Sequence, residues 1–397
     1  MAENQSAATG SRFNAYMALT LATVSMIVCF MAWSNFAPLA SDIAVMFHLS
    51  VSQRTLLLAT PVLLGSIMRI PMGILSDKYG GKKVYLLLMI FILIPLFMIT
   101  RVHTFAMLLV AALLVGMAGT SFAVGVSYAS VWFPPQQQGL ALGIVSMGNM
   151  GNAVAALTLP WISKTHGFDA VYYFLMILTV VLAILFGVLC KEMPVDKTKT
   201  MRGALSVAKE SSTWYLSLFY FLTFGLFVSF TNLTPLFLGD VFGVPQITAG
   251  LYAALFAGLC TIIRPIGGFA ADKKRPMQML QWIFIGIAAF ALLIMLTFKM
   301  QALFVTGIVG VGLVAGFGNG VIFKMVPYVS KGNTGAVTGF VGAMGGLGGF
   351  FPPLVVGWIH GITGHYQLGI FLLVLTALLC WFVLWRRFIH GDVHIVK

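Results

Sequence analysis

Two arginines lie inside long apolar stretches of the chain, and each opens the same short pattern. Arg69 is followed by Gly73 four residues later and by Asp77 eight residues later, and Arg264 repeats this spacing 195 positions further along. A guanidinium stays charged in hydrocarbon and is costly there unless an anion or strongly polar group binds it. Two such groups in matching places predict one anion held between two related halves of the protein.

The aspartate of each pattern is a poor partner for its own arginine. Eight residues along a helix span about 12 Å, too far for a direct ion pair within one helix. Arginine offers planar, forked N–H donors that match a planar oxyanion, whereas a lysine would be a less directional point charge. The chemistry that this pair favours is therefore the binding of a small, flat, singly charged oxyanion.

The elements that position these arginines must be membrane-spanning helices. Of the 397 residues, 60% are hydrophobic and 8% are charged, and the mean hydropathy is +0.99, which no soluble domain of this size could cover with polar surface. Crossing a bilayer takes about 20 apolar residues in a helix. Twelve segments qualify, approximately 15–40, 52–76, 82–100, 104–132, 139–163, 168–190, 213–239, 247–271, 278–298, 302–328, 334–358 and 368–388.

The chain divides into two halves at its most polar stretch. The predicted units are an N-terminal tail (1–14), a six-helix bundle (15–190), a linker that includes an amphipathic surface helix (191–212), a second six-helix bundle (213–388) and a C-terminal tail (389–397). A second repeated pattern supports the division, because the glycines and asparagines at 148–152 align with the glycines at 345–349. We therefore predict an all-α integral membrane protein with two pseudo-symmetric bundles and a central anion site.

The formal charge of +13 is distributed as in a membrane protein and does not indicate a nucleic-acid surface. If the N-terminus is cytoplasmic, sixteen lysines and arginines fall on the cytoplasmic side and four (Arg54, Arg101, Lys164 and Lys299) on the outer side. This bias follows the positive-inside rule and places both termini in the cytoplasm.

Groups that could catalyse a reaction or hold a metal are absent from the predicted helix interiors. The four cysteines are isolated, and every aspartate and glutamate lies in a tail, a loop or at a helix end. No enzyme activity, cofactor or metal is expected, and no carboxylate or histidine is placed to carry protons through the membrane. A sensor is also not favoured, because the longest polar segment is the linker.

Several segments resemble known families. Residues 73–83 (GILSDKYGGKK) resemble the loop signature between the second and third helices of the major facilitator superfamily. Residues 132–143 (WFPPQQQGLALG), 148–152 (GNMGN) and 316–324 (GFGNGVIFK) resemble the paired signatures of the nitrate/nitrite porter family. The resemblance spans nearly the whole chain. It implies a monomeric bacterial carrier of the cytoplasmic membrane whose partners are nitrate, nitrite and the lipid bilayer.

The resemblance also implies roles for individual residues. The candidate substrate-binding residues are Arg69, Arg264, Tyr220, Asn149, Phe122, Phe224, Gly148, Asn319 and Lys324. The candidate gating residues are Gly73, Asp77, Gly80, Lys82, Asp272, Gly151, Gly345 and Gly348. Two alternatives stay open here: the aromatic residues and glycines could be packing residues, and Lys324 could extend to the interface instead of lining the anion pathway.

The predicted mechanism follows from repulsion between two guanidiniums that face one cavity. Closing the halves around an empty site would be costly, and a bound anion would offset that repulsion. We therefore expect nitrate to be exchanged for nitrite as the two bundles rock around the site. Nitrate/proton symport is the alternative within the same family, and a carrier of small organic anions is the alternative outside it.

Overall fold

The computed structural model describes residues 2–134, 136–193, 205–329 and 333–389. Within these residues, twelve helical segments are long and apolar enough to span a membrane. The expected linker (191–212) and C-terminal tail (389–397) fall partly outside the described residues. The described part of the linker ends in a short 3₁₀ turn, η3 (Leu205–Lys209).

The first six spans make up the N-terminal half, and several of them consist of more than one helical element. Their elements are α1 (Ala2–Trp33), α2 (Ala40–Met46), α3 (Val51–Ile67), α4 (Arg69–Tyr79), α5 (Gly81–Ile99), α6 (Phe105–Val115), η1 (Gly116–Thr120), α7 (Ser121–Ser130), α8 (Gln138–Ser146), η2 (Met147–Met150), α9 (Gly151–His166) and α10 (Phe168–Leu189). Of these, α2 is too short to cross a bilayer.

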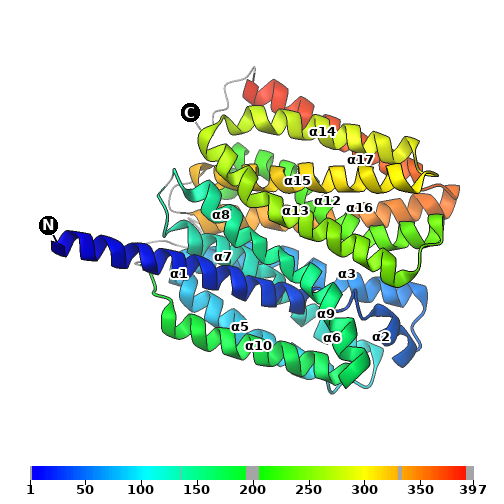
Figure 1. Cartoon of the computed structure of the whole chain (residues 1–397), viewed down its shortest axis with the longest axis horizontal. Coiled ribbons are helices and arrows are strands. Elements are labelled where there is room, and N and C mark those ends of the chain that lie inside the picture. The colour runs from blue at the N-terminus through cyan, green and yellow to red at the C-terminus, as the bar shows by residue number, and fades with distance from the viewer. Residues whose placement is uncertain (1, 135, 194–204, 330–332, 390–397) are drawn as a thin grey trace.

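The last six spans make up the C-terminal half, and they are mostly uninterrupted. Their elements are α12 (Ser211–Phe242), α13 (Gln246–Lys273), α14 (Pro276–Leu296), α15 (Gln301–Val329), α16 (Thr334–Thr363) and α17 (Gln367–Leu384), which continues into a π-helical turn, η4 (Trp385–Ile389). Figure 1 shows the two halves side by side, with α1 beginning and α17 ending at the same end of the molecule. We call this end the termini end.

The outer helices expose apolar side chains, as lipid-facing surfaces do. Leu87 and Ile90 on α5, Ile184 and Val188 on α10, and Trp282 on α14 are all more than half exposed. In water such a surface would be unfavourable, but against lipid tails it is not. The helices that line the molecular centre, α12 above all, bury most of their side chains instead.

The two halves meet along two helix pairs at the termini end, α4 with α16 and α8 with α13. Each pair joins one helix of the N-terminal half to one helix of the C-terminal half. The central arginines begin or lie within two of these four helices, because Arg69 is the first residue of α4 and Arg264 lies in α13. The helices α16 and α13 also contact α3 and α9 of the N-terminal half, so the packing between the halves continues past the arginines.

Several predicted spans differ from the structure: the fourth and fifth are divided by the 3₁₀ turns η1 and η2, and the first two differ as well. The first span was expected to continue to residue 40, but α1 ends at Trp33 and is followed by a turn. The second was expected to be one helix, but it divides at Met68 into α3 and α4. Pro71 explains part of this break, because its missing N–H removes the hydrogen bond to the Ile67 carbonyl.

Candidate functional site

The two central arginines come from opposite halves, and neither side chain is accessible to solvent. Both are 0% exposed. Arg69 follows the break at Met68, and Arg264 precedes Pro265 inside α13. Each guanidinium is buried in the membrane interior, where its N–H groups must find partners or remain unsatisfied at considerable free-energy cost.

Arg69 uses part of its guanidinium to bind backbone carbonyls of both halves. Its Nε donates to the Gly119 carbonyl at 3.1 Å, and its Nη1 donates to the Gly342 carbonyl at 2.7 Å. Gly119 lies in η1, where tighter helical winding leaves carbonyls available, whereas Gly342 belongs to α16 of the other half. Nη2 of Arg69 has no hydrogen-bond partner.

Arg264 has no hydrogen-bond partner among the residues that the structure describes. Its Nε, Nη1 and Nη2 are all buried without one. The Tyr220 hydroxyl and the Cys260 thiol lie close enough to this guanidinium to interact with it electrostatically. Neither forms a hydrogen bond of standard geometry with it. The Tyr220 hydroxyl is itself unpartnered. A cation and a hydroxyl donor thus lie next to each other, and no group in the described part of the chain accepts a hydrogen bond from either.

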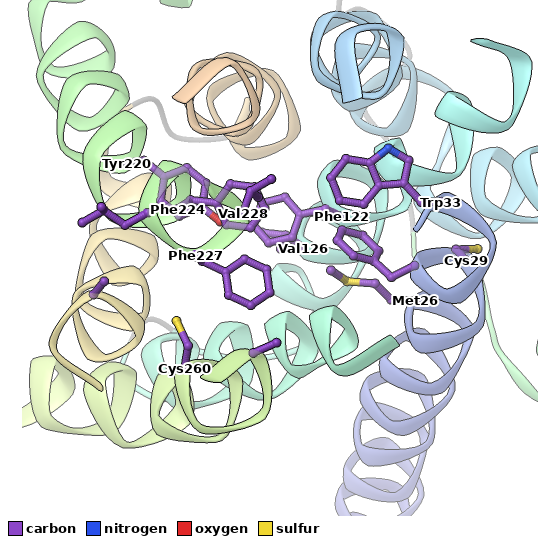
Figure 2. Close-up of a cluster of buried hydrophobic side chains, with 14 of the residues drawn as sticks. Met26, Cys29, Trp33, Phe122, Val126, Tyr220, Phe224, Phe227, Val228 and Cys260 are labelled. Atoms are coloured by element: carbon purple, nitrogen blue, oxygen red, sulfur yellow. The ribbon is translucent and has the colours of Figure 1, made fainter. Parts of the chain in front are cut away.

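A cluster of aromatic rings surrounds the two guanidiniums. Phe224 is shared by both, with its ring centroid 5.2 Å from Cζ of Arg69 and 5.4 Å from Cζ of Arg264. Phe122 and Trp33 lie 5.3 Å and 5.8 Å from the Arg69 Cζ. Figure 2 shows the rings of Tyr220, Phe224, Phe122 and Trp33 between α12 and α1. The ring faces stabilise the buried cations by cation–π attraction.

The rings in this cluster are close together and nearly parallel. The centroids of Tyr220 and Phe224 are 4.9 Å apart at an interplanar angle of 14°. Phe122, from the N-terminal half, lies 6.0 Å from Tyr220 and 6.1 Å from Phe224. Phe323 of α15 packs edge-on against Phe122 and Tyr220 at 4.9 Å and 4.8 Å. The site is thus tightly closed around its aromatic side chains.

Asn319 is a further polar group on the side of α15 that faces the site. It lies one helical turn before Phe323, so both side chains project from the same face of the helix. The Asn319 side chain is buried, and neither its Nδ2 nor its Oδ1 has a hydrogen-bond partner. It could supply an N–H donor to a bound anion.

Two further sequence-predicted site residues lie in η2. Asn149 donates from Nδ2 to the Ser146 carbonyl at 2.7 Å, and its Oδ1 is unpartnered among the described residues. The next residue, Met150, lies beside Gly258 of α13. Gly148 packs against Met26 of α1. Their roles in substrate binding stay predictions.

At the termini end, Asp77 links the two halves. Its Oδ1 accepts from the Gly335 amide at 3.0 Å and its Oδ2 accepts from the Ala336 amide at 2.9 Å. These amides belong to the first turn of α16, where free N–H groups and the helix dipole favour a carboxylate. The Ser127 hydroxyl of α7 donates to the same carboxylate at 3.0 Å.

Asp272 makes the equivalent link in the opposite direction. Its two carboxylate oxygens accept from the Gly139 and Leu140 amides of α8 at 3.1 Å and 3.0 Å. Lys324 forms an ion pair with Asp272, with 2.6 Å between Nζ and Oδ1. Lys324 thus contacts Asp272 in the same way that Ser127 contacts Asp77 in the other half.

Glycines bring the helices of these two links into direct backbone contact. A Cβ at Gly73 would clash with the Gly335 carbonyl, and one at Gly268 would clash with the Gly139 carbonyl. Gly339 likewise lies against the Arg69 carbonyl, and Gly143 lies against Arg264 and Pro265. We call these contacts the α4–α16 seam and the α8–α13 seam. Both are closed in this structure.

Comparison with known proteins agrees with this architecture. The sequence pattern of the Major Facilitator Superfamily matches residues 22–353. The human organic anion transporter MFSD10 (TETRAN) has a similar structure, with a TM-score of 0.77 over 93% of this chain and 99% of that chain. Its sequence is only 15% identical, so this likeness concerns the fold alone. The chain belongs to the major facilitator superfamily.

Two curated relatives narrow the family. The transporter is 36% identical to the nitrite extrusion protein of Bacillus subtilis over 367 residues, which are 91% of this chain and 92% of that one. It is 37% identical to the probable nitrate transporter NarT of Staphylococcus epidermidis over 363 residues, 91% and 93% of the two chains. It therefore belongs with the nitrate/nitrite porters, which confirms the family resemblance and the expectation of a transporter and not an enzyme. The superfamily match and the similar structure confirm the predicted twelve-span fold.

The superfamily loop signature of this transporter contributes Gly73 and Asp77 to the link between the halves, but its end at residues 80–83 contacts the N-terminal half. Gly80 has a φ of 99°, a conformation that favours glycine, and a Cβ there would meet the Glu192 carboxylate. The carboxylate of Glu192 accepts from the Lys82 and Lys83 amides at 3.2 Å and 3.0 Å, and so caps α5 within the N-terminal half. Gating roles for Gly80 and Lys82 stay predictions.

Three other predicted gating glycines of the transporter pack within one half. Gly151 lies against the Ile27 carbonyl of α1, and Gly348 lies against Phe221 and Gly225 of α12. Gly345 supports the site, because it packs against the Tyr220 and Phe224 rings. A larger residue at 345 would displace those two rings.

Sequence reasoning missed several residues that join the halves or surround the arginines. They are Trp33, Gly119, Phe323, Gly342 and the seam glycines Gly139, Gly143, Gly335 and Gly339. The glycines had a detectable signal, because 139 and 335, and 143 and 339, are each separated by 196 residues. No sequence pattern indicated Trp33 or the carbonyl groups of Gly119 and Gly342.

Proposed function

We propose that this protein transports nitrate and nitrite across the cytoplasmic membrane, with the anion bound at Arg264 and Arg69. The relatives named as a nitrite extrusion protein and a probable nitrate transporter support this substrate class. The observation that carries the proposal is the buried Arg264 guanidinium, none of whose nitrogens has a hydrogen-bond partner. An unneutralised cation in the membrane interior is unfavourable until an anion binds it.

The remaining donors around Arg264 suit an anion that can only accept hydrogen bonds. Nη2 of Arg69, the Tyr220 hydroxyl and the Asn319 amide are buried and unpartnered as well. Together with Arg264 they offer N–H and O–H donors from four helices, α4, α12, α13 and α15. Nitrate and nitrite are flat and singly charged, so the planar guanidinium can bind two of their oxygens at once.

The aromatic rings set a size limit in this state. Sandwiching a flat anion between two rings requires about 7 Å, twice a normal van der Waals separation. Phe122 and Tyr220 are only 6.0 Å apart. We infer that the anion binds at the edge of the ring cluster, against Arg264, and that larger oxyanions such as sulfate are excluded by size and by their tightly held hydration.

We propose that the termini end is cytoplasmic and that transport proceeds by exchange. Both seams are closed there, so this conformation is closed to the cytoplasm. Opening toward the cytoplasm requires Asp77 and Asp272 to release α16 and α8. An anion at the arginines lowers the repulsion that opposes closing, and so the loaded protein converts between states faster than the empty one.

Counterflow in proteoliposomes tests this mechanism. Vesicles loaded with nitrite should take up labelled nitrate at least tenfold faster than empty vesicles. Equal uptake into empty vesicles would contradict exchange, and uptake driven by an inward proton gradient would instead indicate nitrate/proton symport. Competition by formate, oxalate or lactate would indicate an organic-anion carrier. We further propose that the protein acts as a monomer, since one chain supplies both arginines.

A further inference from the structure

Hydroxyl groups inside the spans of this protein commonly donate to a carbonyl of their own helix. Ser66, Thr179, Thr223 and Thr261 each donate to the carbonyl four residues earlier, at 2.6 to 3.1 Å. This bond satisfies the hydroxyl without any other partner. Among the described residues, seven buried serine and threonine hydroxyls depart from this pattern and have no hydrogen-bond partner: Ser25, Ser76, Ser121, Thr213, Ser217, Thr234 and Thr338. Three of them, Thr213, Ser217 and Thr338, lie in the first halves of α12 and α16 and are 0%, 1% and 0% exposed.

Two of these hydroxyls lie on the face of α12 that forms the anion site. Thr213, Ser217, Tyr220 and Phe224 are separated by four, three and four residues, so their side chains project from one side of the helix. Tyr220 and Phe224 are part of the ring cluster. Thr213 and Ser217 therefore continue the face of the site toward the termini end.

The third hydroxyl lies on the corresponding face of α16. Thr338 is one turn before Gly342, whose carbonyl accepts from Arg69, and two turns before Gly345, which packs on Tyr220 and Phe224. Because 338, 342 and 345 share one helix face, Thr338 is directed toward the space between the arginines and the termini end.

The packing register brings the three hydroxyls to a similar depth. α12 and α16 run in parallel, with Gly345 at Tyr220 and Gly348 at Gly225. Seven residues before Gly345 on α16 and before Tyr220 on α12, Thr338 is therefore level with Thr213. The ring centroids of Trp214 and Phe340, which follow these two residues, are 6.5 Å apart. The register thus places these three hydroxyls of α12 and α16 at a similar depth, between the arginines and the termini end.

We propose that Thr213, Ser217 and Thr338 form a second, neutral binding station for the transported oxyanion, between the arginines and the cytoplasm. This inference rests on the proposed function. Hydroxyl groups donate hydrogen bonds to an anion without adding positive charge, so they bind it more weakly than a guanidinium does. An anion that leaves two arginines for water must pass the buried faces of α12 and α16 before it regains its hydration, and this creates an energetic barrier. The station lowers that barrier without trapping the anion.

Removing the donors while keeping the shape tests the station. Ser217→Ala combined with Thr338→Val should raise the KM for nitrite presented on the cytoplasmic face about five- to tenfold in everted membrane vesicles. In right-side-out vesicles, the KM for nitrate presented on the outer face should change less than twofold. The variants Ser217→Thr and Thr338→Ser, which keep a hydroxyl, should retain both wild-type KM values.

Thr223→Val is the matched control, because Thr223 is buried in the same helix but donates to the Phe219 carbonyl. It should leave the KM on either face unchanged. The proposal is overturned if the double variant changes both KM values equally, or if Thr223→Val gives the same effect, since either result indicates a packing role. If the wild-type protein does not exchange nitrate and nitrite at all, the proposed function itself is wrong.

Discussion

The two arginines of the site differ in what remains free to bind. Arg69 already donates to one carbonyl of each half, and so it connects the halves as well as facing the anion. Arg264 keeps all its N–H donors available. We therefore assign the main anion contact to Arg264 and a combined binding and conformational role to Arg69.

Replacing either arginine with lysine should abolish most transport although the charge is retained. Arg264→Lys removes the forked donor geometry, and we expect at least a tenfold loss of nitrate exchange with little change in thermal stability. Arg69→Lys should lose transport and also lower the melting temperature, because one ammonium cannot bridge both carbonyls as the guanidinium does. Exchange assays and thermal unfolding of the purified proteins measure the two effects.

Arg101→Lys is the control for these variants, because Arg101 is exposed and stacks on Phe97 outside the site. It should retain normal exchange. Near-normal exchange in Arg264→Lys would show that the forked geometry is not required.

Tyr220→Phe should weaken anion binding without unfolding the protein. The variant removes one unpartnered donor beside Arg264, and a hydrogen bond to an anion is worth about 1.5 kcal/mol or more, or a tenfold increase in KM. Tyr172→Phe is the contrasting variant, since its hydroxyl donates to Asn35 at 3.1 Å away from the site. Tyr172→Phe should lower the stability of the protein and leave the KM for nitrate unchanged. An unchanged KM in Tyr220→Phe, or a raised KM in Tyr172→Phe, would argue against a contact between Tyr220 and the anion.

At the scale of elements, the two seams are related by the internal repeat. Asp77 holds the first turn of α16, and Asp272 holds the first turn of α8. Each carboxylate comes from one half and caps a helix of the other. Capping by a carboxylate is worth about 1 kcal/mol or more, so the two caps favour the closed termini end without preventing its opening.

Gly268→Ala should open the α8–α13 seam. The added Cβ would clash with the Gly139 carbonyl, and backbone atoms cannot move aside as a flexible side chain can. We expect a large loss of exchange and faster hydrogen exchange at the first amides of α8. Gly250→Ala in the same helix meets nothing within 4 Å and should behave as wild type. Unchanged protection of α8 in Gly268→Ala would contradict the seam.

The effects of substituting Lys324 and Asp272 on stability should be strongly non-additive, because the two side chains form an ion pair. Asp272→Asn leaves a buried ammonium next to a neutral group and weakens the cap on α8, which we expect to cost about 3 kcal/mol of stability. Adding Lys324→Gln to Asp272→Asn should recover part of that loss. A double-mutant cycle with purely additive effects would show that the pair does not act as a unit.

At the scale of the molecule, the sequence predicted the architecture well. Twelve spans, two halves and the arginine pair follow from hydropathy, from the 195-residue repeat and from the cost of a buried charge. Tyr220, Phe224 and Phe122 were placed by family resemblance, and the structure brings them together around the arginines.

The unpredicted features depend on contacts between distant segments. The hydrogen bond from Arg69 to the Gly342 carbonyl joins residues 273 positions apart. Because every residue has a backbone carbonyl, the sequence does not indicate which one accepts this bond. The ion pair of Lys324 with Asp272 could not be distinguished from an interfacial lysine by hydropathy alone. The break at Met68 has a local cause in Pro71, yet Pro265 lies within the uninterrupted helix α13, so tertiary packing decides the outcome.

Nitrate binding to the purified protein, measured by calorimetry, tests the central claim most directly. The wild-type protein should bind one nitrate per chain, Arg264→Lys should bind it at least tenfold more weakly, and Arg101→Lys should bind it normally. Unchanged nitrate affinity in a correctly folded Arg264→Lys protein would contradict the claim that this buried, unpartnered guanidinium holds the transported anion.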